Sequence, residues 1–119
     1  MSPSSRQRGD RAEQMACDYL LAQGLELYER NYRCRCGEID LIMGDGASLA
    51  FIEVRYRSSS RFGSAAETVQ RRKQARIAAA AARYLQSNPK LARRPARFDV
   101  VLLQPPATIE WIKDAFRIG

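Results

Sequence analysis

Apolar residues recur along the chain with two spacings, one typical of helices and one typical of strands. Between residues 9 and 23 they return every three or four positions and predict a helix that Gly24 ends. The apolar stripe of this helix consists of Ala12, Ala16, Tyr19 and Leu20. A second helix is expected over 66–86, where alanine is frequent and Pro89 follows.

Shorter apolar runs predict five strands. They cover residues 25–33, 38–43, 48–57, 97–103 and 108–116. The order of helix, three strands, helix and two strands indicates an α/β (α+β) fold with a mixed central sheet flanked by helices. At 119 residues the chain has room for a single domain over 8–119, and residues 1–7 are expected to be a disordered tail.

Three acidic residues interrupt the second and third predicted strands. The Asp45-Gly46 step between these strands is a strong hairpin signal, so the strands should be antiparallel neighbours. Depending on the register, Glu53 lies opposite Glu38 or opposite Asp40. Either register places all three carboxylates on one face, because side chains alternate along a strand.

Both faces of this hairpin are expected to be covered. The face opposite the acids should be an unbroken apolar surface of Ile39, Leu41, Met43, Ala50, Ile52, Val54 and Tyr56. The acidic face is itself apolar near the turn, through Ile42, Leu49 and Phe51. Two like charges about 4 Å apart repel by roughly 1 kcal/mol in water and about 4 kcal/mol near a protein surface, so a positive group should lie among the carboxylates. The candidates are Arg55, in a salt-bridged edge, and a hard divalent cation.

Composition narrows the possible chemistry. The chain contains no histidine, which excludes Ser-His-Asp and Cys-His catalysis and histidine-containing zinc sites. Its three cysteines, Cys17, Cys34 and Cys36, are expected to be reduced thiols of a cytoplasmic protein. No stretch approaches the roughly 20 apolar residues of a membrane span, and no apolar signal segment is recognisable, so no membrane association is expected.

Positive charge is concentrated in one part of the chain. The whole chain has a net charge of +7, and residues 55–97 contain 12 Lys and Arg but one acid, Glu67. Of the 20 cations, 17 are arginine, whose planar group suits bidentate contacts with phosphate. This distribution favours nucleic acid as the partner.

Helical periodicity separates two surfaces of the second helix. Arginines on its outward face are opposed by an inward face of Ile77, Ala81, Tyr84 and Leu85. The outward arginines are Arg72, Arg76 and Arg83. Gln74 falls on the inward side, where it either reaches the carboxylates or is satisfied by water at the helix start. The polar loop 58–64, which includes Arg61, is either a phosphate contact or an ordinary linker.

Six segments carry a resemblance to a known family. They are Gly9-x-x-Ala12-Glu13-x-x-Ala16-x-x-Tyr19-Leu20, Arg30-Asn31-Tyr32-Arg33, Gly37-Glu38-Ile39-Asp40-Leu41-Ile42, Phe51-Ile52-Glu53-Val54-Arg55-Tyr56-Arg57, Lys73-Gln74 and Arg97-Phe98-Asp99-Val100. The chain resembles the YraN-like family of small bacterial proteins, which are similar to archaeal Holliday-junction resolvases. Asp40 and the triplet Glu53-Val54-Arg55 occupy the places of the Asp and (Asp/Glu)-x-Lys motifs of the PD-(D/E)XK nucleases, whose core is restriction-endonuclease-like.

The resemblance implies a metal-dependent DNA endonuclease-like hydrolase of DNA repair or recombination, with branched DNA as a candidate substrate. It implies that Asp40, Glu53 and the backbone carbonyl of Val54 bind Mg²⁺ or Mn²⁺. The candidate catalytic residues are Asp40, Glu53, Arg55, Glu13 and Gln74. The nucleic acid, DNA rather than RNA, would be held by Arg35, Arg57, Arg61, Arg72, Lys73, Arg76 and Arg83. The metal would lower the pKa of a bound water that attacks the phosphodiester.

Arg55 departs from the motif, because the family triplet ends in lysine. Arginine stays protonated and cannot act as a base, although it can stabilise a charged phosphate. A catalytically impaired nuclease-fold protein that binds nucleic acid is therefore the alternative to an active nuclease, and a module binding an acidic protein is a third. A resolvase-like role would favour a two-fold homodimer, for which Trp111 and its neighbours offer an apolar edge unless Trp111 packs into its own core.

Overall fold

The computed structural model describes residues 5–56, 69–104 and 108–117. Its elements are α1 (Ser5–Ala22), β1 (Glu26–Cys34), β2 (Gly37–Asp45), β3 (Ser48–Tyr56), α3 (Arg71–Ser87), the short 3₁₀ helix η1 (Leu91–Arg93), β4 (Ala96–Gln104) and β5 (Thr108–Phe116). This confirms the predicted order of helix, three strands, helix and two strands. None of the described helices is long and apolar enough to cross a membrane.

The five strands form one mixed sheet in the order β1-β2-β3-β4-β5. Neighbouring strands are antiparallel except β3 and β4, which run parallel. A parallel pair needs a long crossover connection, and the segment that contains α3 supplies it. The mixed sheet flanked by helices is a restriction-endonuclease-like arrangement, as the sequence predicts.

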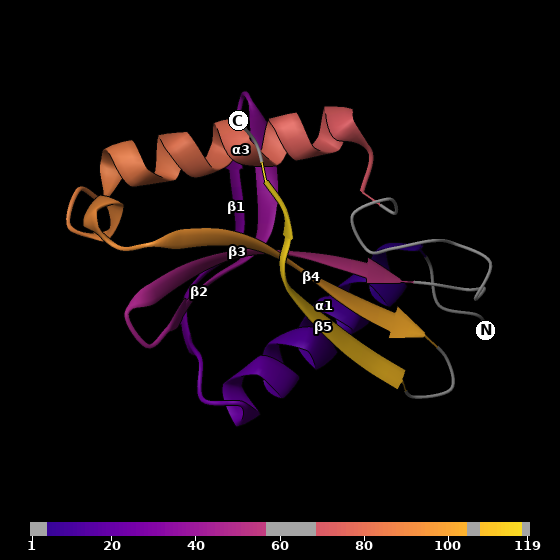
Figure 1. Ribbon diagram of the computed structural model, residues 1–119. Helices are drawn as coiled ribbons and strands as arrows, with labels where there is room; N and C mark the ends of the chain where they lie inside the picture. Colours follow the sequence, from indigo (N-terminus) through magenta and orange to yellow (C-terminus); the bar gives the residue numbers. More distant parts are fainter. Residues whose placement is uncertain (1–4, 57–68, 105–107, 118–119) are drawn as a thin grey trace.

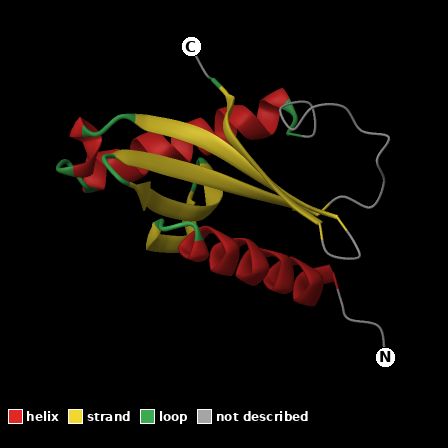
Figure 2. Ribbon diagram, turned by 60° about the horizontal axis from the view of Figure 1, so that its bottom comes forward, coloured by secondary structure: helices red, strands yellow, loops and turns green. Residues whose placement is uncertain are grey.

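The two helices cover opposite faces of the sheet (Figures 1 and 2). On one face, Ile77, Ala81 and Tyr84 of α3 pack with Phe51 in one core cluster. On the other face, the predicted stripe of α1 packs in a second cluster on Leu41, Met43, Ala50 and Ile52. Trp111 packs against this second cluster, so the structure supports its place in the core of its own chain.

The hairpin of β2 and β3 has the second of the two expected registers. Asp45 pairs with Ser48, and the ladder continues to the pair Leu41 and Ile52. Gly46 adopts a φ of 59° in the turn, a left-handed conformation that glycine adopts without strain. Asp40 and Glu53 follow the pair Leu41 and Ile52 along the two strands, so this register places them opposite each other.

The prediction of one unbroken apolar surface on this hairpin is partly wrong. Ile39 packs in the cluster on the α3 side, whereas Leu41 and Met43 pack on the α1 side. Figure 1 shows the reason, because β1 and β2 curve away from the rest of the sheet toward α3. Tyr56, placed on the same surface by the alternation of residues, is 57% exposed.

The helices begin at different residues from those expected. α1 starts at Ser5 rather than near Gly9, because a single glycine is tolerated inside a helix at a cost of about 1 kcal/mol. α3 starts at Arg71 rather than at residue 66. Val69 and Gln70, which were expected to be helical, lie before the helix. Residues 66–68 and the first four residues of the tail expected over 1–7 lie outside the described residues.

The expectation of three reduced thiols is wrong for two of them. Cys34 and Cys36 form a disulfide at the turn between β1 and β2, whereas Cys17 is a buried free cysteine. The turn places the two Cα atoms 5.4 Å apart, within the range that a disulfide spans. This pair was not predicted, because an odd number of cysteines with this spacing does not form a recognisable disulfide framework.

Candidate functional site

Asp40 and Glu53 meet across neighbouring strands. They occupy the step after the pair Leu41 and Ile52, and their carboxyl groups are hydrogen-bonded to each other. The backbone N–H of Val54 donates to Oδ2 of Asp40 over 2.8 Å. The hairpin therefore brings together the two carboxylates that the sequence predicts as metal ligands.

Burial dominates the electrostatics of this pair. Glu53 is only 3% exposed, and its burial raises its pKa to about 7, with the charge of Asp40 adding to the rise and Lys73 opposing it. Burial also raises the pKa of Asp40, while the hydrogen bond from Val54 opposes that rise. The pair therefore holds a proton at pH values where exposed carboxylates are fully charged.

Glu13 reaches the same point from α1. Its side chain is hydrogen-bonded to Asp40 and to Asn31, and burial together with the charge of Asp40 raises the pKa of Glu13 to about 7. Three elements, α1, β2 and β3, thus contribute one carboxylate each. The resemblance implied this approach of Glu13, and the structure places it there.

Asn31 is a site residue that the sequence analysis missed. It lies between the pairs Arg30–Leu41 and Tyr32–Ile39 of the β1–β2 ladder, and its φ of 52° is left-handed. Asparagine tolerates this conformation better than most residues, and it is uncommon in strands. An asparagine in the middle of a predicted strand was therefore the available signal.

Two positively charged side chains contact the same carboxylate oxygen of Glu53. Nζ of Lys73 lies 2.9 Å from Oε1 of Glu53, and Nη1 of Arg55 lies 3.9 Å from it. The proximity of Arg55 was expected from the strand pattern. The closer contact comes from Lys73 in the first turn of α3, a residue that the sequence analysis assigned to nucleic-acid binding. The start of α3 therefore belongs to the carboxylate site.

Glu38 and Gln74 were also predicted near the carboxylates, and the structure shows a partner for each. Glu38 is exposed and pairs with Arg33 over 3.2 Å, although its charge still raises the pKa of Asp40. Nε2 of Gln74 donates to the carbonyl of Val69 over 2.8 Å and so ties the helix to the segment before it.

The predicted nucleic-acid contacts fall in three places. Arg72, Arg76 and Arg83 are exposed on α3, on the face opposite its buried residues, as helical periodicity predicts. Arg35 is exposed in the β1–β2 turn. Arg57 and Arg61, with the polar loop 58–64, lie outside the described residues.

The site offers two oxygen-ligand side chains for a cation. Within residues 5–56, 69–104 and 108–117, no group of three or more His, Cys, Asp or Glu side chains is arranged to hold a metal ion. Mg²⁺ is commonly held by one or two carboxylates, with waters and substrate phosphates completing its shell. The pair Asp40 and Glu53 fits that pattern, and its all-oxygen chemistry suits Mg²⁺ or Mn²⁺.

Comparison with known proteins identifies the family. The family model described as "Uncharacterised protein family UPF0102" matches residues 12–103. The chain is similar to the UPF0102 protein of Nitrosococcus oceani, with 52% identity over 99% of this chain and 98% of the relative. It is also similar to the UPF0102 protein of Saccharophagus degradans, with 50% identity over 93% of each chain. The chain therefore belongs to the UPF0102 family, a YraN-like group with a PD-(D/E)XK-like nuclease fold.

Proposed function

We propose that this protein is a cytoplasmic, metal-dependent DNA endonuclease that hydrolyses phosphodiesters in repair or recombination, with branched DNA as a candidate substrate. The observation that carries the proposal is the convergence of Asp40, Glu53 and Glu13 from three elements, beside Lys73. The exposed arginines of α3 support a polyanionic substrate. DNA is favoured over RNA by the resemblance to resolvases.

Asp40, Glu53 and the carbonyl of Val54 would hold Mg²⁺ or Mn²⁺. The donor set supports this assignment, because Glu53 is buried and has a pKa of about 7, so it can exchange its proton for a cation shared with Asp40. When bound, the cation would supply Lewis acidity, lower the pKa of a water and stabilise charge on the leaving oxygen.

The other residues of the site would position the water and the phosphate. Glu13, with a pKa of about 7, is suited to accept the proton of the attacking water. The water oxygen would bond to phosphorus as the bond to the leaving strand breaks, and the leaving oxygen would take a proton from solvent. Lys73 would hold Glu53 in place, and Arg55 would stabilise the charge of the phosphate.

A nuclease-fold binding protein with little turnover is the second candidate function. The contacts of Arg55 and Lys73 with one oxygen of Glu53 favour it, because they form an ion-paired edge that needs no metal. The same arginines of α3 would then bind nucleic acid without cleaving it. In either case, a two-fold homodimer through the edge strand β5 would let two sites meet two strands.

A cleavage assay separates the two candidates. Pure protein would be incubated with linear duplex, single-stranded and four-way DNA, with and without Mn²⁺. Mn²⁺-dependent cleavage that disappears in Asp40→Asn supports the enzyme. Cleavage by Arg55→Lys but not by the unchanged protein would assign the impaired site. Absence of cleavage by both would overturn the hydrolytic proposal.

A further inference from the structure

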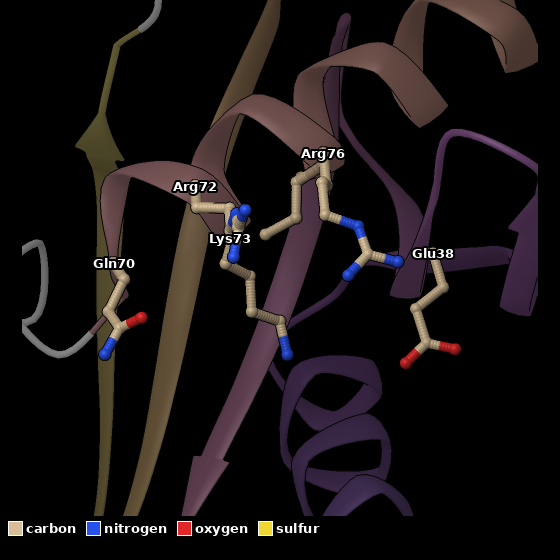
Figure 3. A pocket seen from close by; sticks show the side chains of 6 residues that line it. Glu38, Gln70, Arg72, Lys73 and Arg76 are labelled. Atoms are coloured by element: carbon tan, nitrogen blue, oxygen red, sulfur yellow. The ribbon is translucent and has the colours of Figure 1, made fainter.

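A small cavity lies next to the carboxylates, over the first turns of α3 (Figure 3). Its volume is about 250 Å³, and it is lined by Glu38, Gln70, Arg72, Lys73, Arg76 and Ile77. In Figure 3, Lys73 and Arg76 extend from α3 toward the same side, and the guanidinium of Arg76 lies toward Glu38. Lys73 is common to the cavity and to the carboxylate site, so the two are neighbours.

The cavity is positively charged. Arg72 and Arg76 are exposed, and in the described part of the chain neither has an ion-pair partner, which leaves both guanidinium groups available to a ligand. The first turn of α3 contains no acidic residue. Glu38 is the acid among the described lining residues, and it is already paired with Arg33.

Size and charge together identify the ligand. Pockets for drug-sized molecules occupy about 300–1,000 Å³, so this cavity suits a smaller group. Guanidinium groups bind phosphate oxygens in a bidentate manner, which makes phosphate the anion that best matches this pair of arginines. We propose that this cavity is a subsite for one phosphate group of the nucleic acid, adjacent to the phosphodiester at Asp40 and Glu53.

This inference rests on the proposed function and adds a direction to it. Lys73 stands between the two positions, so the strand would run from the carboxylates along the first turns of α3 toward Glu38. The arginines of α3 then differ in role. Arg72 and Arg76 hold a defined phosphate, whereas Arg83, which does not line the cavity, contributes to the general field of the helix.

The phosphate has two possible sources, an internal phosphodiester or a terminal phosphomonoester. Both would be tested on the full chain in EDTA, so that neither metal nor cleavage enters the measurement. Binding of inorganic phosphate would be followed by NMR chemical shifts. Binding of short single-stranded DNA carrying a 5′-phosphate, a 3′-phosphate or hydroxyl ends would be followed by fluorescence anisotropy.

Four variants carry the test. Arg72→Ala and Arg76→Ala should each weaken phosphate binding about tenfold, because each removes charge-assisted hydrogen bonds. Arg93→Ala removes the same charge from an exposed position outside the lining and should change binding less than twofold. Glu38→Gln should strengthen binding, a gain that misfolding cannot produce.

The outcomes are decisive. Tighter binding of one phosphorylated end identifies the terminal group as the ligand, and equal binding of all ends, still sensitive to Arg72→Ala, identifies an internal phosphate. An equal loss in Arg93→Ala, or no gain in Glu38→Gln, would overturn the subsite. Failure of the nuclease proposal is distinguishable, because it appears as absent cleavage while phosphate binding without metal persists.

Discussion

At the scale of single residues, three neighbouring carboxyl groups determine the electrostatics of the site. Each pKa shift has burial as its largest cause, and the charge of Asp40 adds to the shifts of Glu13 and Glu53. Lys73 offsets part of this cost at 2.9 Å from Glu53, which is closer than Arg55. Carboxyl groups with pKa values raised in this way are typical of functional positions.

The raised pKa values predict that stability falls as pH rises. The folded state binds a proton at Glu53 with a pKa of about 7, against an ordinary value of 4.5. The stabilisation is therefore complete below about pH 4.5 and is lost as pH rises through 7. We expect the free energy of unfolding in EDTA to fall by on the order of 1–3 kcal/mol between pH 5 and 8, measured with urea.

A matched variant isolates the cause of that pH dependence. Glu53→Gln cannot titrate, so its stability should change less over the same pH range, and the chain has no histidine to obscure the difference. Stability that rises with pH in the unchanged protein, or an identical slope in both proteins, would contradict the assignment.

At the scale of elements, the sequence predicted the strands better than the contacts between elements. Alternating apolar residues located all five strands, because each strand packs at least one face on a core cluster. The contact of Lys73 with Glu53 depends on how α3 lies on the sheet, which no local pattern encodes. Asn31 had a local signal, as an asparagine within a predicted strand, but its contact with Glu13 appears only when β1 and α1 are assembled.

The Arg97-Phe98-Asp99-Val100 motif acts in β4 as a structural clamp. Asp99 is fully buried and accepts hydrogen bonds from Nε of Arg97, from Nε1 of Trp111 and from the backbone N–H of Asp114. Arg97 also reaches Asp45 over 2.8 Å. The clamp thus joins β4 to β5 and to the turn of the β2–β3 hairpin.

Removing the charge of Asp99 should loosen this clamp. Asp99→Ala leaves Arg97 without its buried partner, and breaking a buried pair costs about 3–5 kcal/mol. Chemical denaturation should show a loss of this size, with Glu110→Gln, an exposed change on β5, within about 0.5 kcal/mol of the unchanged protein. Equal unfolding curves for the two variants would show that the clamp is not stabilising.

At the scale of the whole molecule, charge is separated along the fold. Four exposed arginines, Arg71, Arg72, Arg76 and Arg83, lie on α3. The acidic site lies between the start of this helix and α1, and the two helices cover opposite faces of the sheet (Figure 2). Such polarity attracts a polyanion to one side of the molecule and leaves the carboxylates within reach of it.

This polarity predicts salt-dependent binding. The logarithm of the DNA affinity should fall linearly with the logarithm of the salt concentration, because each neutralised phosphate releases counterions. Replacing Arg72 and Arg76 together by alanine should reduce the slope for duplex DNA by about two, at roughly 0.9 for each phosphate contact. A flat slope in a filter-binding or anisotropy titration would instead indicate a protein partner.

We propose that one divalent cation binds between Asp40 and Glu53. Calorimetric titration of the pure protein with Mn²⁺ at neutral pH tests it directly, with Asp18→Asn, an exposed change on α1, as the control. We expect one bound ion in the unchanged protein and in the control, with affinity reduced at least tenfold in Asp40→Asn and in Glu53→Gln. Equal affinity in all four proteins, or binding in none of them, would contradict it.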